Sequence, residues 1–207
     1  MTLNQCYNAL LAEKLMKEFG KRNFEGFYCE TKEDAINTIR DILPKNTLVS
    51  CGGSASLQEI GLIEVLTDGN YTFLNPNGAG NAADKDVIAH KALASDYYFM
   101  SANAISESGE LVNTDGYGNR VGALIFGPKK VIVVAGLNKV ESNLDAAINR
   151  VKTCAARKIL LRFKQDYSSL EELSEAAEAA CSQLVITGKS AIKGRIKIIL
   201  VGESLGF

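Results

Sequence analysis

The hydrophobic pattern of the chain alternates between a helical period and short apolar runs. In residues 4–19, apolar side chains recur at helical spacing, which predicts a helix ended by Gly20. A second helix is predicted from Thr31, where Asp34 follows three residues later as in a capping box, and it ends before Pro44. Further helices are predicted at residues 84–94, 143–156 and 168–181, and after the glycine turn within residues 47–66.

Short apolar segments between these helices have the composition of strands. The segment KKVIVVAG at residues 129–136 is a continuous apolar run, typical of a strand buried on both faces of a parallel sheet. Aromatic residues favour another strand at residues 97–101. The remaining predicted strands lie at residues 26–29, 71–75 and 195–207 and at the start of residues 47–66. Residues 104–127 contain three turn signals and are expected to form one or two hairpin-like turns.

Strands and helices alternate over most of the chain, which predicts an α/β fold with a mostly parallel sheet flanked by helices. The sequence contains no internal repeat and no low-complexity linker. We therefore expect residues 1–207 to form a single domain, with the first helix, residues 1–20, packed on it.

Composition and charge exclude several classes of protein. The chain has 207 residues, with 23 basic and 24 acidic side chains and a net charge of -1, which argues against a nucleic-acid binder. No apolar run approaches the roughly 20 residues that cross a bilayer, and the first segment lacks the basic start of a signal peptide. These features favour a cytoplasmic protein that does not bind membranes.

The cysteines and the histidine also limit the chemistry. The five cysteines are scattered and the single histidine is His90, so we expect free thiols and no metal site made by this chain alone. Cys51 lies beside a predicted helix start, where a thiol pKa can fall, although a buried strand residue is the better interpretation.

A first candidate site is the turn SCGGSASL at residues 50–57, where a strand leads into a helix. The glycines Gly52 and Gly53 would let a ligand approach the backbone, and Ser54 and Ser56 could donate hydrogen bonds. A tight turn with a serine N-cap explains the same residues equally well. The segment matches neither the phosphate-binding GxxxxGK motif nor the dinucleotide motif GxGxxG, so nucleotide hydrolysis is not supported.

A second candidate site lies in residues 104–127. Glu107 follows a predicted strand and could act as a nucleophile or a general base. Arg120 could hold a carboxylate or phosphate with two hydrogen bonds. Further polar candidates in this segment are Asn113, Asp115 and Asn119, although aspartate and asparagine often only cap turns.

A third candidate is Lys139, which follows the apolar strand at residues 129–136. A lysine at the carboxyl end of a central strand can face the ligand crevice of an open α/β sheet. A solvent-exposed lysine before a helix would have the same spacing. The three candidate sites all follow predicted strands, which strengthens the interpretation as one site.

Three segments in this order resemble one family: GGSASLQEIG at residues 52–61, NAISESGELVNTDGYGNRVGALIFGPKKVIVVAGLNKV at 103–140, and KGRIKIILVGESLGF at 193–207. The chain resembles the LUD (lactate utilization) domain family, in particular its C-type members. The resemblance implies the fold shared by sugar-phosphate isomerases and coenzyme A transferases. It also implies a role in oxidising L-lactate to pyruvate together with iron–sulfur subunits. The expected ligand is a small carboxylate or phosphate-bearing molecule, and a homo-oligomer is one expected form.

The chain departs from this family in one segment. Many short members carry a cysteine-rich segment before the final strand, whereas residues 161–181 here hold only Cys181. We therefore expect no metal, cluster or cofactor in this chain.

Two other functions fit parts of the sequence. The segment Ser106-Glu107-Ser108-Gly109 is similar to the Ser-Glu-Asn-Gly motif of coenzyme A transferases, which implies that Glu107 would form an acyl thioester and that the glycine turn would stabilise the oxyanion. The other alternative is a non-catalytic adaptor that binds a small ligand.

Overall fold

A computed structural model describes residues 2–163 and 166–207. Within these residues, a sheet of six strands runs in the order β1-β10-β7-β4-β2-β3, and every neighbouring pair is parallel. The strands are β1 (Glu25–Cys29), β2 (Leu48–Cys51), β3 (Thr72–Leu74), β4 (Tyr97–Met100), β7 (Lys130–Gly136) and β10 (Ile196–Val201). The prediction of an α/β fold with a mostly parallel sheet is confirmed.

Strand β7 lies in the interior of this sheet, between β10 and β4. Its residues alternate between two apolar clusters: Val131 and Val133 belong to one, Ile132 and Val134 to the other. Because side chains alternate along a strand, the continuous apolar run fills both faces of the sheet. The expectation for residues 129–136 is therefore confirmed.

Helices cover both faces of the large sheet. One face carries side chains from α1 (Leu3–Lys21), α5 (Ala82–Ala92) and α6 (Asn119–Ile125), and the other from α2 (Lys32–Ile42), α3 (Ala55–Glu59) and α4 (Leu62–Leu66). The predicted capping box of α2 is present, since the Thr31 hydroxyl accepts from the Asp34 N–H. Gly61, with φ of 73°, separates α3 from α4, where the sequence pattern predicts one helix.

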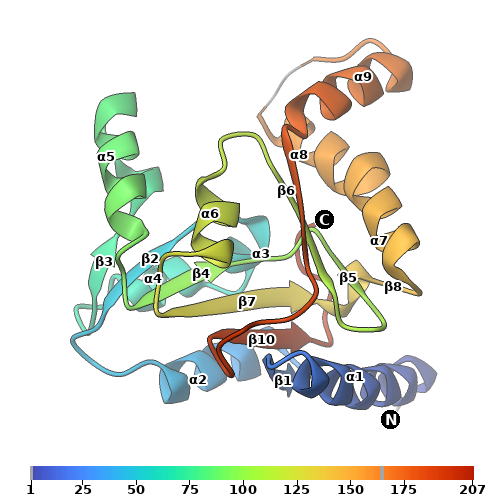
Figure 1. Cartoon of the computed structure of the whole chain (residues 1–207), viewed down its shortest axis with the longest axis horizontal. Coiled ribbons are helices and arrows are strands. Elements are labelled where there is room, and N and C mark those ends of the chain that lie inside the picture. The colour runs from blue at the N-terminus through green and yellow to red at the C-terminus, as the bar shows by residue number, and fades with distance from the viewer. Residues whose placement is uncertain (1, 164–165) are drawn as a thin grey trace.

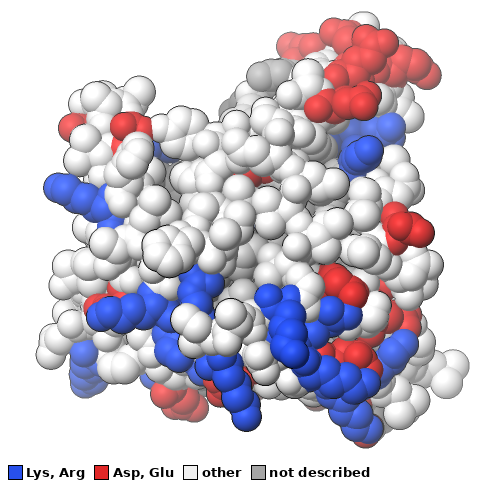
Figure 2. Space-filling view, in the orientation of Figure 1, with Lys and Arg blue, Asp and Glu red and all other residues white. Residues whose placement is uncertain are grey.

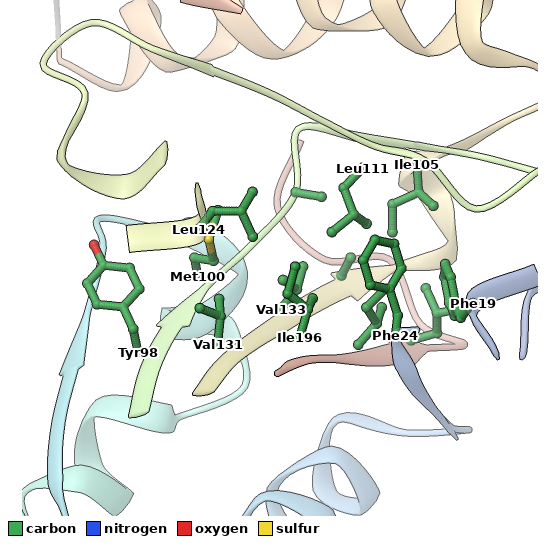
Figure 3. Packing of buried hydrophobic residues seen from close by; sticks show 14 of the residues in the cluster. Phe19, Phe24, Tyr98, Met100, Ile105, Leu111, Leu124, Val131, Val133 and Ile196 are labelled. Atoms are coloured by element: carbon green, nitrogen blue, oxygen red, sulfur yellow. The ribbon is translucent and has the colours of Figure 1, made fainter. Parts of the chain in front are cut away.

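A smaller sheet packs on one face of the large sheet. In the described chain it has four strands in the order β8-β5-β6-β9: β5 (Ala104–Ser106), β6 (Leu111–Asp115), β8 (Val140–Glu141) and β9 (Gln183–Thr187). Figure 3 shows Ile105 and Leu111 from this sheet next to Phe24, Val133 and Ile196 of the main core.

The segment 104–127, for which one or two hairpin-like turns are predicted, contains one hairpin. Ser108 and Gly109 connect β5 and β6 as a hairpin, with Gly109 at φ of 92°. The later turn instead starts α6, because Gly118 adopts φ of 90° at the N-cap. Strand β9, which the sequence pattern does not predict, pairs with the other edge of β6.

Two helical arms rise from the large sheet on either side of α6 (Figure 1). One arm is α5, preceded by the short 3₁₀ helix η1 (Pro76–Gly78). The other contains α7 (Leu144–Arg150), a π-helical turn at Val151–Ala155, α8 (Ala156–Arg162) and α9 (Leu170–Ala180), and the 3₁₀ helix η2 (Leu137–Lys139) leads toward it. Figure 2 shows acidic side chains gathered over α9, basic side chains gathered near α1, and a mainly uncharged face between the arms.

Among residues 2–163 and 166–207, no helix is both long enough and apolar enough to cross a bilayer.

The N-terminal helix is anchored by Phe19, which is fully buried and packs 6.4 Å from the ring of Phe24. We expect Phe19→Ala to lower the free energy of unfolding by about 3–5 kcal/mol, because it leaves a cavity under α1. Leu10 lies on the same helix with 68% of its surface exposed, so Leu10→Ala is the matched control with an expected change below about 0.5 kcal/mol. Urea unfolding measures both values, and equal effects would contradict this packing.

Candidate functional site

A cavity of about 1060 Å³ lies between the two helical arms. Its floor is formed where β2, β4 and β7 end, and these three strands are parallel neighbours in the large sheet. Open α/β sheets bind ligands outside the carboxyl ends of their strands, because the following loops converge there. Helix α5 lines one side of the cavity and α8 with the end of α9 lines the other.

Lys139 is the buried amine at the floor of this cavity. Its side chain enters from η2, directly after β7, and the residue is only 4% exposed. Its Nζ donates to Ser56 Oγ at 2.8 Å and to Ser101 Oγ at 3.0 Å. Ser56 follows β2 and Ser101 follows β4, so each of the three neighbouring strands contributes one residue. The predicted convergence of the first and third candidate sites is found in the structure.

The surroundings of Lys139 favour its neutral form. Burial, together with the nearby charges of Arg150 and Arg120, lowers the pKa of its amine from 10.5 to about 7. Glu59 and Cys154 act in the opposite sense but more weakly. A lysine in this state exchanges its proton near neutral pH, which an ordinary surface lysine does not.

Arg120 lies beside the floor of the cavity, but its donors are already used by the protein. Nη1 donates to Ser101 O at 3.0 Å and to Asn113 Oδ1 at 3.1 Å. Nη2 donates to Asn103 Oδ1 at 3.0 Å and to Thr114 O. Four donors are therefore committed, and the interpretation that Arg120 grips a ligand through two hydrogen bonds is corrected: it supplies positive charge and fixes the loops.

The polar neighbours of Arg120 have separate roles. Asp115 Oδ2 accepts from the backbone N–H of Arg120 at 3.1 Å and of Val121 at 3.3 Å, so it caps the start of α6, as the turn interpretation suggests. Asn113 is buried behind Arg120, and its Nδ2 has no hydrogen-bond partner among the described residues. Asn119 and Asp115 line the cavity.

The two glycines of the Gly-Ser turn differ in their surroundings. A Cβ on Gly52 would lie 3.0 Å from Tyr98 Oη and 3.2 Å from Arg120 Cδ, so close packing requires this glycine. Gly53 is open: its nearest neighbour would be Asn77 Oδ1, at 3.8 Å. Ser54 is the N-cap of α3, with Oγ accepting from Leu57 N at 3.3 Å, whereas Ser56 faces Lys139.

Two cysteines, Cys51 and Cys181, line the cavity. Burial raises the pKa of the Cys51 thiol to about 12, so the interpretation as a buried strand residue is the better one. Cys181 ends α9 and lines the cavity. Across residues 2–163 and 166–207, no three His, Cys, Asp or Glu side chains converge as metal ligands. The residues present here do not fit the cluster that the family's cysteine-rich segment would hold.

Glu107 lies outside the cavity. It sits in the turn between β5 and β6, and its Oε2 accepts from Lys14 Nζ of α1 at 2.6 Å. Gly52 and Gly53 line the cavity and Glu107 does not, so the structure does not bring them together in one site. The geometry gives no support to the thioester mechanism.

The sequence patterns do not single out Ser101, which lines the cavity, or Arg150, which contacts the cavity residue Asn103. Arg150 Nη1 donates to Asn103 O at 2.6 Å, while Asn103 Oδ1 accepts from Arg120. The signal for Ser101 is its position directly after a buried strand, as for the other residues of the floor. Nothing local marks Arg150, which lies on α7.

Known proteins resemble this chain in sequence family and in fold. A sequence model of the LUD domain matches residues 12–201. A crystal structure of a DUF162 family protein from Deinococcus radiodurans is similar with a TM-score of 0.55 and 12% sequence identity, over 94% of this chain and 98% of that chain. At this identity the likeness concerns the fold. No curated protein matches the chain.

The contrast between the two glycines gives a stability prediction. Gly52→Ala should lower the free energy of unfolding by about 1–3 kcal/mol. Arg120 is held by its hydrogen bonds and Tyr98 is buried, so neither side chain can move away from the added methyl group. Gly53→Ala should change it by less than about 0.5 kcal/mol. Urea unfolding of both variants tests this, and a neutral Gly52→Ala would show that Arg120 is not fixed.

Proposed function

The chain belongs to the LUD domain family, a family associated with lactate utilization, and from this premise and the geometry of the cavity we propose that it is a lactate utilization protein that binds a small carboxylate between its two helical arms. The observation that carries the proposal is Lys139, buried between Ser56 and Ser101 at the floor of the cavity. L-lactate and pyruvate are the ligands that the family association suggests.

The charge around the floor supports an anionic ligand. Lys139, Arg120 and Arg150 are basic, and their pairing with carboxylates is weak or peripheral: Arg120 Nε lies 3.9 Å from Asp115, and Arg150 Nε lies 3.5 Å from Glu141. Among the described residues, no carboxylate lies within 4.0 Å of Lys139 Nζ. A carboxylate that enters this space gains attraction that is little screened by water.

We further propose that the chain acts as a subunit of an iron–sulfur system that oxidises L-lactate to pyruvate. Oxidation of lactate releases electrons that need an acceptor. The segment that is cysteine-rich in many relatives keeps only Cys181, and its surroundings do not supply a cluster site. The proposal therefore places the electron carriers in partner subunits and ligand binding in this chain.

Ligand binding gives a pH-dependent prediction. L-lactate and pyruvate should bind most tightly below pH 7, where Lys139 is protonated, and more weakly as the pH rises above its pKa of about 7. Lys139→Gln should weaken binding at pH 6 by tenfold or more, since a charge-assisted hydrogen bond contributes about 1.5–3 kcal/mol. Lys85 also lines the cavity but is exposed on α5, so Lys85→Gln is the control and should change affinity by less than about threefold.

Isothermal titration calorimetry measures these affinities. Binding that is equally strong in Lys139→Gln and in the unmodified protein would place the ligand elsewhere. If neither acid binds, the proposal that this chain binds L-lactate or pyruvate is wrong.

The proposed association with iron–sulfur subunits gives a separate prediction. Native mass spectrometry of the tagged protein, purified gently from its host, should detect iron–sulfur subunits bound to it. Deletion of the gene should slow growth on L-lactate and leave growth on glucose unchanged. Normal growth on lactate, with a protein that is isolated alone, would contradict a role in lactate oxidation.

A further inference from the structure

The environment of Lys139 is unusual for a residue that only attracts an anion. In the part of the chain that the structure describes, its Nζ has two hydroxyl partners and no carboxylate partner within ion-pair distance. A neutral amine has two N–H donors, and Ser56 Oγ and Ser101 Oγ account for both. The nitrogen lone pair is then left unengaged, on a side chain that lines the cavity.

Burial beside other cations is a known way to make a lysine nucleophilic. Desolvation and the neighbouring charges of Arg120 and Arg150 both oppose protonation of Lys139. An unprotonated, positioned lysine attacks carbonyl carbon to form a Schiff base. The positive charge of Arg120, which lines the cavity, also favours an anionic group on the ligand, such as the carboxylate of an acid.

The hydroxyls are less suited to be the attacking group. Ser56 Oγ accepts from Lys139 and from Ser101, at 3.3 Å in the latter case. It is also crowded by the C-terminal segment, because a Cβ on Gly206 would lie 2.8 Å from it. Ser101 Oγ faces both Ser56 Oγ and Ala102 O at 3.3 Å. These contacts fit a pair of side chains that orient the amine and relay its protons.

We propose that Lys139 forms a covalent imine with a 2-oxo acid bound in the cavity. This inference rests on the proposed function and deepens it: it names the carbonyl form of the ligand as the reactive one and assigns Lys139 as its covalent attachment point. Pyruvate is the smallest member of this class whose carbonyl group is a ketone. A cavity of about 1060 Å³ leaves room for 2-oxo acids with longer side chains.

The reaction balances without another reactant. The Nζ lone pair attacks the C2 carbonyl carbon, the new C–N bond forms, and the carbonyl π electrons move to oxygen. A proton passes from nitrogen to that oxygen through the serine hydroxyls, which gives a carbinolamine. Loss of the oxygen as water, with the second amine proton, leaves the C=N bond. L-lactate carries a hydroxyl in place of the carbonyl at C2, so it can occupy the cavity but cannot form the imine.

Reductive trapping tests the imine on the full-length protein. The protein is incubated with pyruvate and sodium cyanoborohydride, which delivers hydride to the C=N carbon and fixes the adduct as a secondary amine. Intact mass spectrometry and peptide mapping should find one adduct, on Lys139. Excess L-lactate or oxamate, an amide analogue that cannot form an imine, should suppress it.

Two matched variants test whether the adduct requires the amine of Lys139. Lys139→Arg keeps the positive charge but cannot form an imine, so it should lose the adduct. Lys85→Arg should retain it, because Lys85 is an exposed lysine on the cavity wall. If Lys139→Arg fails to fold, the peptide map of the unmodified protein and its suppression by oxamate still decide the question.

The outcomes separate this inference from the proposed function. Pyruvate that binds by calorimetry but gives no adduct on Lys139, or gives adducts spread over surface lysines, would overturn the imine and leave carboxylate binding standing. If neither L-lactate nor pyruvate binds, the proposed ligand and the imine both fall.

Discussion

The burial of three neighbouring basic side chains, Arg120, Arg150 and Lys139, is the constraint on which the floor of the cavity depends. Arg120 donates to the side chain of Asn103 and Arg150 donates to its carbonyl. Lys139 lies among them with two serine hydroxyls. Buried cations are costly unless hydrogen bonds satisfy their donors. Here backbone carbonyls and amide oxygens satisfy most of them, and carboxylates are kept at 3.5 Å or more from the two arginine Nε atoms.

This network also joins the two sheets. Arg120 donates to Ser101 O, at the end of β4, and to Asn113 and Thr114 on β6. Asn103 Oδ1 in turn accepts from Thr114 N at 3.0 Å. One arginine therefore fixes the point where the large sheet continues into the smaller one. Gly52 is part of the same arrangement, because the Arg120 side chain packs against its backbone where a Cβ atom would be.

The same charges connect structure to chemistry. In the proposed function the positive neighbours would attract an anion into the cavity, and they also make Lys139 release its proton more easily. The two effects suit different steps: the charge favours capture of a carboxylate, and the neutral amine favours attack on a carbonyl group. A site that needed only to bind an anion would gain from a fully protonated lysine, which a nearby carboxylate would maintain.

The sequence by itself determined the features that depend on neighbouring residues. The capping box at Thr31, the apolar run of β7 and the serine cap of α3 are local patterns, so they were predictable, as were the α/β class and the positions of Ser56 and Lys139 after strands. Only the tertiary structure decided which of these positions meet. Ser56 and Lys139 are 83 residues apart, and parallel pairing of their strands brings them together. The fold places Glu107 beside Lys14 of α1 and commits the donors of Arg120 to protein oxygens. It also adds Ser101 to the floor and places Arg150 against the backbone of Asn103. Strand β9 escaped prediction because its side chains are mostly exposed, and its place is set by backbone pairing with β6, which no side-chain pattern records.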